Sequence, residues 1–426
     1  MDNNNQPRQT GRAGRVHYGF VVLGLVILVV FSALGLARFG YTSILPAMQE
    51  ALRLSNTQTG VLQSWNLIGY LVTVVFSGIL AARFGPRVVI AVGLLVVALG
   101  MGLTGLIPTF RAGCAGRFLA GVGGASSNVP AMALLSAWFG ARRRGLAAGA
   151  GAAGSSVGLI VTGPLVPAIL QRTGDEGWRV SWGVLAGLTL VVFAAAALFL
   201  RNRPAEMGLR AIGESEAESR PAAATASGLD WGSVYRSRRL GKLAAIYFGF
   251  GFSYIIYSTF FVRYLTGEAG FSRTGAGGLW SQVGVVSIVG GFLWGSVSDR
   301  RGRRAALLWV FALQGMAFLL FGLGRETWSV YLSAALFAAT AWSVPALMAA
   351  LCGDLFGARL APAALGLITL VFGMGQALGP YLAGAIADAT HSFAPAFLLA
   401  GAAALLVGGG GSLFFLGKVS RGSAAG

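Results

Sequence analysis

The chain has 426 residues, of which 55% are hydrophobic and only 11% are charged, and it contains 65 glycines. This composition excludes a water-soluble globular core and is typical of proteins with many membrane-spanning segments. Lys and Arg outnumber Asp and Glu by 32 to 14, but the basic residues gather in short tracts between apolar runs. That arrangement favours a role in membrane topology over nucleic-acid binding.

Twelve apolar runs follow one another along the chain, six on each side of a polar stretch. Each run is long enough to cross a bilayer as a helix. We therefore expect an all-α integral membrane protein with twelve transmembrane helices. The predicted helices cover residues 18–48, 60–82, 88–108, 112–138, 145–170, 179–200, 241–265, 275–297, 305–324, 328–355, 361–386 and 393–416.

A ten-residue signature occurs twice, as GSVSDRRGRR at 295–304 and in an altered form, GILAARFGPR, beginning at position 78. Repetition at this spacing indicates that a six-helix unit was duplicated and that both copies enter the membrane in the same orientation. We expect two bundles related by a pseudo-two-fold axis. The predicted parts are an N-terminal tail (1–17), two six-helix bundles (18–200 and 241–416), a linker (201–240) and a C-terminal tail (417–426).

The basic tracts predict the orientation. They fall on one side of this topology, whereas the opposite loops mix cations with acids, so both termini are expected in the cytoplasm and the protein in the inner membrane. The first apolar run is too long for a cleaved signal peptide and is expected to remain in the protein. Residues 214–227 predict a mobile linker, and residues 229–239 fit either a short amphipathic helix on the membrane or a plain loop.

Two motifs carry a family resemblance. The signature at 295–304 resembles the loop motif of the major facilitator superfamily, and RFLAGVGG at 117–124 resembles its fourth-helix motif. The resemblance covers the whole chain. It implies a secondary transporter in which two six-helix bundles rock around a cavity lined by the first, fourth, seventh and tenth helices. We expect a monomer with no cofactor and no metal.

The signature also predicts a gate on the cytoplasmic side. A carboxylate at a helix end, facing arginines and the N-terminus of a helix from the other bundle, would hold that side shut. In the first copy Ala82 replaces the acid, so one of the two latches is expected to be weaker. The predicted gating residues are Asp299, Arg300, Arg303, Arg83 and Arg117.

Charges inside the membrane are informative about the substrate, because a charged group in hydrocarbon is costly unless it faces a cavity or a partner. Arg38 and Arg117 are the two candidates in the predicted helices. Arg117 lies near a helix end, where a structural role is the more common one, and Arg38 is predicted to bind substrate. The predicted helices carry no carboxylate at mid-height, which disfavours proton-driven export of cations. An anion could instead move by proton symport or by anion exchange.

Neutral polar and aromatic residues of the predicted helices would complete the binding site, although such groups can equally form interhelical bonds. Tyr41 follows Arg38 by three residues, and Tyr257 and Thr259 match the helix-one segment at the repeat offset, so all three are predicted to accompany Arg38. The predicted substrate-binding residues are Arg38, Tyr41, Asn66, Asn128, Tyr254, Tyr257, Thr259, Gln282, Trp342 and Gln376.

A narrower resemblance concerns the substrate. The segments at 136–147, 163–165, 177–179 and 203–209 are similar to the bacterial oxalate/formate antiporter and monocarboxylate porter branch. Those relatives hold carboxylates with cations in the seventh to eleventh helices, and here 276–297 and 361–386 carry none. The segments at 36–41 and 254–260 are also similar to bacterial permeases labelled sugar effluxers.

Three functions stay open on these grounds. A small organic anion such as a monocarboxylate is the favoured substrate, and efflux of a neutral sugar-like or amphiphilic compound is the alternative. A membrane sensor with the same fold that does not transport is a more remote one. An enzyme is disfavoured, because His17 and His391 fall on opposite faces of the membrane and the sequence shows neither a metal-binding cluster nor a nucleophile with a nearby base.

Overall fold

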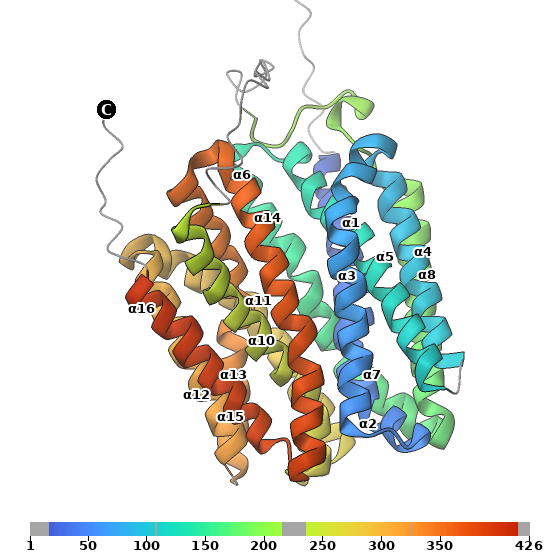
Figure 1. The fold of residues 1–426 in the computed structure, drawn as a ribbon. Helices are drawn as coiled ribbons and strands as arrows, with labels where there is room; N and C mark the ends of the chain where they lie inside the picture. The colour runs from blue at the N-terminus through green and yellow to red at the C-terminus, as the bar shows by residue number, and fades with distance from the viewer. Residues whose placement is uncertain (1–16, 107–108, 215–235, 325, 416–426) are drawn as a thin grey trace, which may run out of the picture.

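The protein, analysed as a computed structural model, is built from helices. The structure describes residues 17–106, 109–214, 236–324 and 326–415. Within these ranges the only β-structure is an isolated bridge between Phe139 and Ile212. Figure 1 shows two groups of helices side by side, one from the blue and green half of the chain and one from the yellow and red half. The all-α membrane fold predicted from the sequence is confirmed.

The first group contains the helices up to residue 199. Its first membrane crossing is continuous but changes character at η1, a wider π-helical segment between two α-helices. The elements are α1 (Tyr18–Val30), η1 (Phe31–Phe39), α2 (Gly40–Leu52), α3 (Asn56–Phe84), α4 (Pro86–Leu106), α5 (Phe110–Trp138), α6 (Ala141–Ala152), α7 (Gly154–Thr173), the short η2 (Gly174–Glu176) and α8 (Gly177–Phe199).

The second group begins after the linker. Its longest element, α14, is kinked at Gly357, where the backbone leaves the helical conformation (φ 71°). The elements are α10 (Arg238–Gly267), α11 (Arg273–Arg301), α12 (Arg303–Leu323), α13 (Thr327–Thr340), α14 (Ser343–Thr390), α15 (Ala394–Ala402), the π-helical η4 (Ala403–Gly410) and α16 (Gly411–Phe415).

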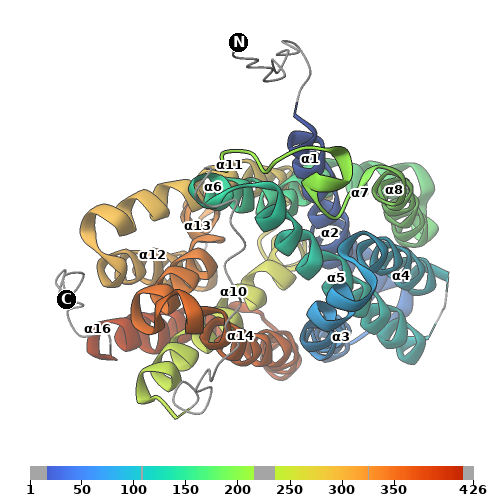
Figure 2. The ribbon, with the colours of Figure 1, turned by 90° about the horizontal axis from the view of Figure 1, so that it is seen from above.

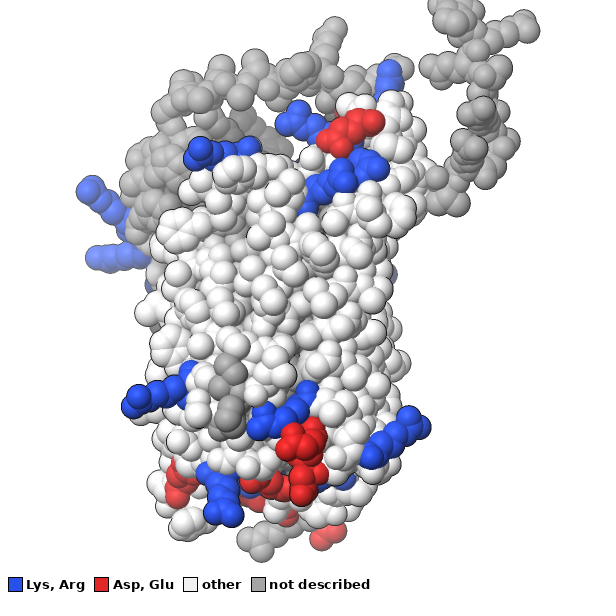
Figure 3. All heavy atoms as spheres, turned by 90° about the vertical axis from the view of Figure 1, so that its right-hand side faces the viewer, with Lys and Arg blue, Asp and Glu red and all other residues white. Residues whose placement is uncertain are grey.

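Within the described ranges, eleven helical stretches are long and apolar enough to span a membrane. One of them, Arg142–Phe199, has 58 residues and contains both α7 and α8, so the stretches account for twelve crossings. Figure 3 shows the consequence on one face of the molecule, where an uncharged band separates charged side chains at the two ends. The observed helix ends lie within about four residues of the predicted ones.

The uncharged band has two edges. We call the edge where α1 begins and α8 ends the linker side, and the edge where α2 passes into α3 and α10 into α11 the far side. Both signature loops lie on the linker side and turn on equivalent glycines, Gly85 (φ 84°) and Gly302 (φ 88°), which end α3 and α11. Residues with a side chain are disfavoured at such backbone angles. The glycine that occurs at the same place in both copies of the signature therefore allows two matching turns.

The first part of the predicted linker packs against the first group of helices. Residues 204–207 form the short 3₁₀ helix η3 (Pro204–Met207). The indole N–H of Trp138 donates to the carbonyl of Arg201 (3.0 Å), and the N–H of Ile212 donates to the carbonyl of Trp138 (2.9 Å). Residues 215–235, which include most of the expected mobile stretch and the possible amphipathic helix, lie outside the described residues.

Glycines let helices of the first group approach closely. A Cβ added at Gly158 of α7 would lie 2.1 Å from the Cα of Gly35 in η1, much closer than atoms tolerate. We expect Gly158→Val to separate the first and fifth crossings and to cost about 1–3 kcal/mol or more of stability. Thermal unfolding in detergent measures this, with Gly183→Val, whose Cβ would meet nothing within 4 Å, as the matched control. Equal melting temperatures for the two variants would contradict this account of the packing.

Candidate functional site

Arg38 lies where the first crossing departs from regular α-helix. In η1 the N–H of Gly40 donates to the carbonyl of Gly35, five residues earlier, as a π-helix requires. Widened turns of this kind are frequent at functional sites, since they re-aim side chains. Arg38 is in the last turn of η1 and is only 6% exposed. The segment thus places a cation deep in the protein at about the mid-height of the molecule.

The positive charge of Arg38 has no carboxylate partner among the described residues, whose ion pairs all involve other arginines. Its guanidinium carbon lies 4.5 Å from the ring centre of Tyr70 in α3. The guanidinium also interacts with Tyr254 of α10, and its Nε is buried without an acceptor. Aromatic faces attract a cation but do not neutralise it, so Arg38 carries an uncompensated charge between the two groups of helices.

Two tyrosine and amide pairs flank Arg38, one from each group of helices. The Nδ2 of Asn128 in α5 donates to the hydroxyl of Tyr70 (2.9 Å). The Nε2 of Gln376 in α14 donates in the same way to the hydroxyl of Tyr254. We call Arg38, Tyr70, Asn128, Tyr254 and Gln376 the Arg38 cluster. Four of its members were predicted as substrate-binding residues, and the structure brings them together.

Aromatic rings surround Tyr254, one of the two cluster residues that come from the second group of helices. Tyr254 stacks on Phe250 (ring centres 4.8 Å apart) and lies nearly parallel to Phe372. Trp342, predicted for the site, meets Tyr254 edge-on at 6.2 Å and contacts Phe39 of η1 at 5.2 Å. Its indole N–H also donates to the hydroxyl of Ser156 in α7 (3.0 Å). Trp342 therefore sits between the two groups of helices, next to the Arg38 cluster.

Other predicted substrate-binding residues are not brought to Arg38. The hydroxyl of Tyr257 bonds to that of Ser333 (2.8 Å) inside the second group, Thr259 is buried there without a partner for its Oγ1, and Gln282 is exposed on α11. Asn66 donates to the backbone carbonyl of Arg117 (3.1 Å). Tyr41 donates to the carbonyl of Thr59 (2.8 Å). The last two residues hold the first group of helices together.

Arg117 is fully buried within the first group of helices rather than at a boundary between the groups. Its Nη1 donates to the carbonyl of Ala37 and its Nη2 to the Oε1 of Gln63, both at 2.5 Å. Its guanidinium carbon lies 4.6 Å from the ring centre of Tyr41 and 5.4 Å from that of Trp182. This placement fits the structural role weighed for Arg117 in the sequence, since it joins η1, α3 and α5.

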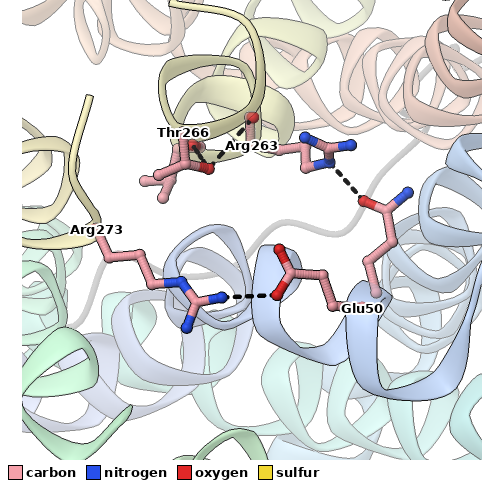
Figure 4. Close-up of polar contacts among 6 residues, drawn as sticks. Glu50, Arg263, Thr266 and Arg273 are labelled. Carbon is pink, nitrogen blue, oxygen red and sulfur yellow. Dashed lines mark hydrogen bonds and ion pairs between the residues drawn. The ribbon is translucent and has the colours of Figure 1, made fainter. Parts of the chain in front are cut away.

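On the far side, charged and polar contacts join the two groups of helices. Arg273 at the start of α11 forms an ion pair with Glu50 of α2 (2.6 Å), and the Nε of Arg263 in α10 donates to the Oε1 of Gln49 (2.6 Å). Figure 4 shows Arg273 pointing at Glu50 and Arg263 pointing at the same helix. Because both side chains of the Glu50 pair are largely exposed, this ion pair alone contributes little, about 0–1 kcal/mol.

A stronger far-side contact is made by Asp388 near the end of α14. Its carboxylate accepts from the N–H groups of Asn56 (2.9 Å) and Thr57 (2.8 Å) and from the hydroxyl of Thr57 (2.5 Å). Asp388 therefore caps the N-terminus of α3, a helix of the other group, where a negative charge is favoured. The sequence alone does not indicate this contact, because the partners of Asp388 lie more than three hundred residues earlier in the chain.

The helices that carry these contacts are tightly packed on the far side. A Cβ at Gly384 of α14 would lie 2.2 Å from the carbonyl oxygen of Asn56, and one at Gly60 of α3 would lie 2.1 Å from that of Pro380. Near mid-height, the hydroxyls of Ser156 in α7 and Ser287 in α11 are hydrogen-bonded (2.9 Å). Figure 2 shows α3 beside α14 at the boundary between the two groups. The two groups are thus locked together from the far side to about mid-height.

Arg303, a predicted gating residue of the signature, forms its ion pairs within one group of helices and not between the two groups. Arg303 pairs with Asp299 (2.6 Å) and with Asp354 (3.1 Å), and all three belong to the second group of helices. Asp299 and Arg300 are exposed on the linker side, and so is Arg83 at the end of α3. Among the described residues, Asp299 forms its ion pair within its own group of helices rather than with the other one, as expected when the far side is the closed one.

Comparison with known proteins agrees with this architecture. The family model described as "Uncharacterised MFS-type transporter YbfB" matches residues 28–410. The probable sulfoacetate transporter SauU of Cupriavidus necator is 26% identical over 91% of this chain and 92% of its own. Monocarboxylate transporter 12 of Xenopus laevis is 25% identical over 66% of this chain and 64% of its own.

Solved structures show the same fold. A bacterial homologue of the human lysosomal transporter Spinster superposes with a TM-score of 0.74 at 16% identity, covering 94% of this chain and 97% of its own. The nucleoside transporter NupG superposes with a TM-score of 0.71 at 14% identity, covering 95% and 100%. With the family match over nearly the whole chain, the twelve crossings and the two signature loops, this chain belongs to the MFS-type transporters of the major facilitator superfamily.

Proposed function

We propose that this transporter carries a small organic anion across the inner membrane by alternating access, with Arg38 as the residue that binds the negative charge. The linker side is then cytoplasmic, in line with the basic tracts of the sequence. The two groups of helices act as the rocking N- and C-terminal bundles. The protein works as a monomer, coupled to a proton or to a counter-anion.

The uncompensated charge of Arg38 carries the proposal. A buried guanidinium without a carboxylate is costly in the resting protein, and an anionic ligand would remove that cost. Arg38 and Tyr70 come from the N-terminal bundle, and Tyr254 and Gln376 come from the C-terminal bundle. A ligand held among them contacts both bundles, which alternating access requires of a substrate. The names of two relatives, for sulfoacetate and for monocarboxylates, are compatible with an anion.

The structure fits one state of this cycle. Asp388, Gln49 and Glu50 connect the bundles on the far side, whereas Asp299 and Arg303 pair within the C-terminal bundle. We interpret this as the state closed to the outside. Substrate would then exchange from the linker side, and the far-side contacts would have to break before the site faces outward.

A thermal-shift screen of purified protein tests the proposal, because a ligand that binds the folded state raises its melting temperature. The panel contains small carboxylates, their methyl esters, sugars and common drugs. We expect at least one carboxylate to stabilise the protein and its ester to have no effect. Stabilisation by an ester as large as that by its acid, or by sugars alone, would favour the neutral-substrate alternative and contradict the anion proposal.

A further inference from the structure

The Arg38 cluster offers a ligand a single positive charge. Arg38 and Arg117 are the buried charged residues among those described, and Arg117 is already engaged. Its two terminal nitrogens donate to Ala37 and Gln63, and its guanidinium lies against the rings of Tyr41 and Trp182. A second negative charge on a ligand would therefore stay uncompensated in a medium of low dielectric constant, which is unfavourable. The charge balance favours a monovalent anion.

The two tyrosine hydroxyls of the cluster keep their own protons available. The hydroxyl oxygen of Tyr70 accepts from Asn128 and that of Tyr254 accepts from Gln376. Neither hydroxyl donates its own proton to an acceptor among the described residues. An amide that donates to a tyrosine oxygen leaves the O–H group free to donate elsewhere. The site therefore presents two hydroxyl donors beside one guanidinium, with one hydroxyl from each bundle.

The remaining surroundings are apolar and aromatic. Trp342 and Phe39 contact each other across the bundle boundary, and Phe250 and Phe372 stack with Tyr254 at interplanar angles of 14° and 4°. Trp342 and Phe372 are only partly buried, so their rings have surface left for contact. Aromatic faces of this kind bind flat or apolar groups better than hydrated ones.

We infer that the Arg38 cluster binds a singly charged carboxylate with an apolar body, and that Tyr70 and Tyr254 determine this specificity by donating their hydroxyl protons to the carboxylate oxygens. The inference rests on the proposed anion transport. It adds the charge and the polarity of the substrate and the two hydroxyl groups that recognise it. Because the two hydroxyls belong to opposite bundles, the same contacts that select the ligand also link its binding to the relative position of the bundles.

Calorimetric titration of the full-length protein in detergent tests the inference with five probes. Benzoate is a monovalent anion with an apolar body, propionate is a smaller one, malonate and sulfoacetate are divalent, and methyl benzoate is neutral. We expect benzoate to bind most tightly and propionate more weakly. The two divalent anions and the ester should bind at least about tenfold more weakly than benzoate. The second charge of a divalent anion stays uncompensated in the site, and the neutral ester forms no ion pair with Arg38.

Two conservative variants distinguish a role of the two hydroxyls in ligand binding from a role in stability. Tyr70→Phe and Tyr254→Phe keep the ring and remove the donor, and each should weaken benzoate binding about tenfold while leaving the weak binding of methyl benzoate unchanged. Tyr257→Phe is the matched control, because its hydroxyl bonds to Ser333 within the C-terminal bundle. It should lower the melting temperature slightly and leave the affinity for benzoate at the wild-type value.

The outcomes distinguish this inference from the proposed function. Malonate or sulfoacetate binding as tightly as benzoate, or wild-type affinity in both Tyr→Phe variants, would overturn the inference while anion transport still stood. An equal loss of affinity in Tyr257→Phe would overturn the assignment of the two hydroxyls. Tight binding of methyl benzoate, or the absence of binding by every anion in the panel, would instead contradict the proposed function itself.

Discussion

Replacing Arg38 by glutamine is expected to weaken binding of the proposed anionic substrate by about ten- to a hundredfold, since a charge-assisted hydrogen bond contributes about 1.5–3 kcal/mol. Arg38→Lys should recover part of the affinity, because an ammonium keeps the charge but lacks the planar fork that can hold both carboxylate oxygens. Calorimetry on the acid that gives the largest thermal shift measures both variants.

The matched control for Arg38→Gln is Arg172→Gln, because Arg172 is an exposed cation in the last turn of α7. Arg172→Gln removes the same charge far from the Arg38 cluster and should leave the affinity for the acid at the wild-type value. Arg38→Gln should also raise the melting temperature of the unliganded protein, because an uncompensated buried charge is gone. Normal binding by Arg38→Gln, together with loss of binding in a tyrosine variant of α10, would contradict the anion account.

Replacing Asp388 by asparagine is expected to open the far side. The change removes the charge from an acceptor of three hydrogen bonds that cap α3 across the bundle boundary. The lost contact energy, about 1.5–3 kcal/mol, would lower the ratio of far-side-closed to far-side-open molecules by about ten- to a hundredfold. A cysteine at Ser43, which lines a small far-side cavity between the bundles with Val262 and Arg273, reports the change.

The labelling rate of this cysteine with a maleimide, in a background without Cys114 and Cys352, should rise in Asp388→Asn. Glu326→Gln provides the matched control, because Glu326 is an exposed far-side acid and its carbonyl, not its carboxylate, accepts the two hydrogen bonds from Ser329. Asp299 lies on the linker side, so Asp299→Asn should slow transport without raising the labelling rate of the cysteine at position 43. Equal labelling of wild type and Asp388→Asn would show that this cap does not hold the far side closed.

Most of the fold could be predicted from the sequence because it rests on local properties. Apolar runs of membrane length predict the crossings, and the glycines at 85 and 302 mark two equivalent turns. The far-side contacts could not be predicted, since Asp388 and Asn56 are brought together only by the packing of α14 on α3. Charge at a helix end gives no information on which helix of the other bundle it meets.

The site was predicted in part, and the differences have physical causes. Tyr41 was placed beside Arg38 on α-helical spacing, but the π-helical η1 ends between them and changes the angle between their side chains. Tyr257 was matched to the first helix by the repeat offset. Residues matched in this way occupy equivalent places in the two bundles rather than facing ones, and Tyr257 packs among the rings of its own bundle.

Exchange of labelled acid in proteoliposomes tests the central claim most directly, namely that Arg38 binds an anion that this protein carries across the membrane. Vesicles containing the wild-type protein and loaded with unlabelled acid should take up labelled acid, and an excess of the methyl ester as competitor should not lower the rate. Vesicles with Arg38→Gln should show little exchange at equal protein content. Wild-type rates in Arg38→Gln, or exchange of the ester as fast as the acid, would contradict the claim.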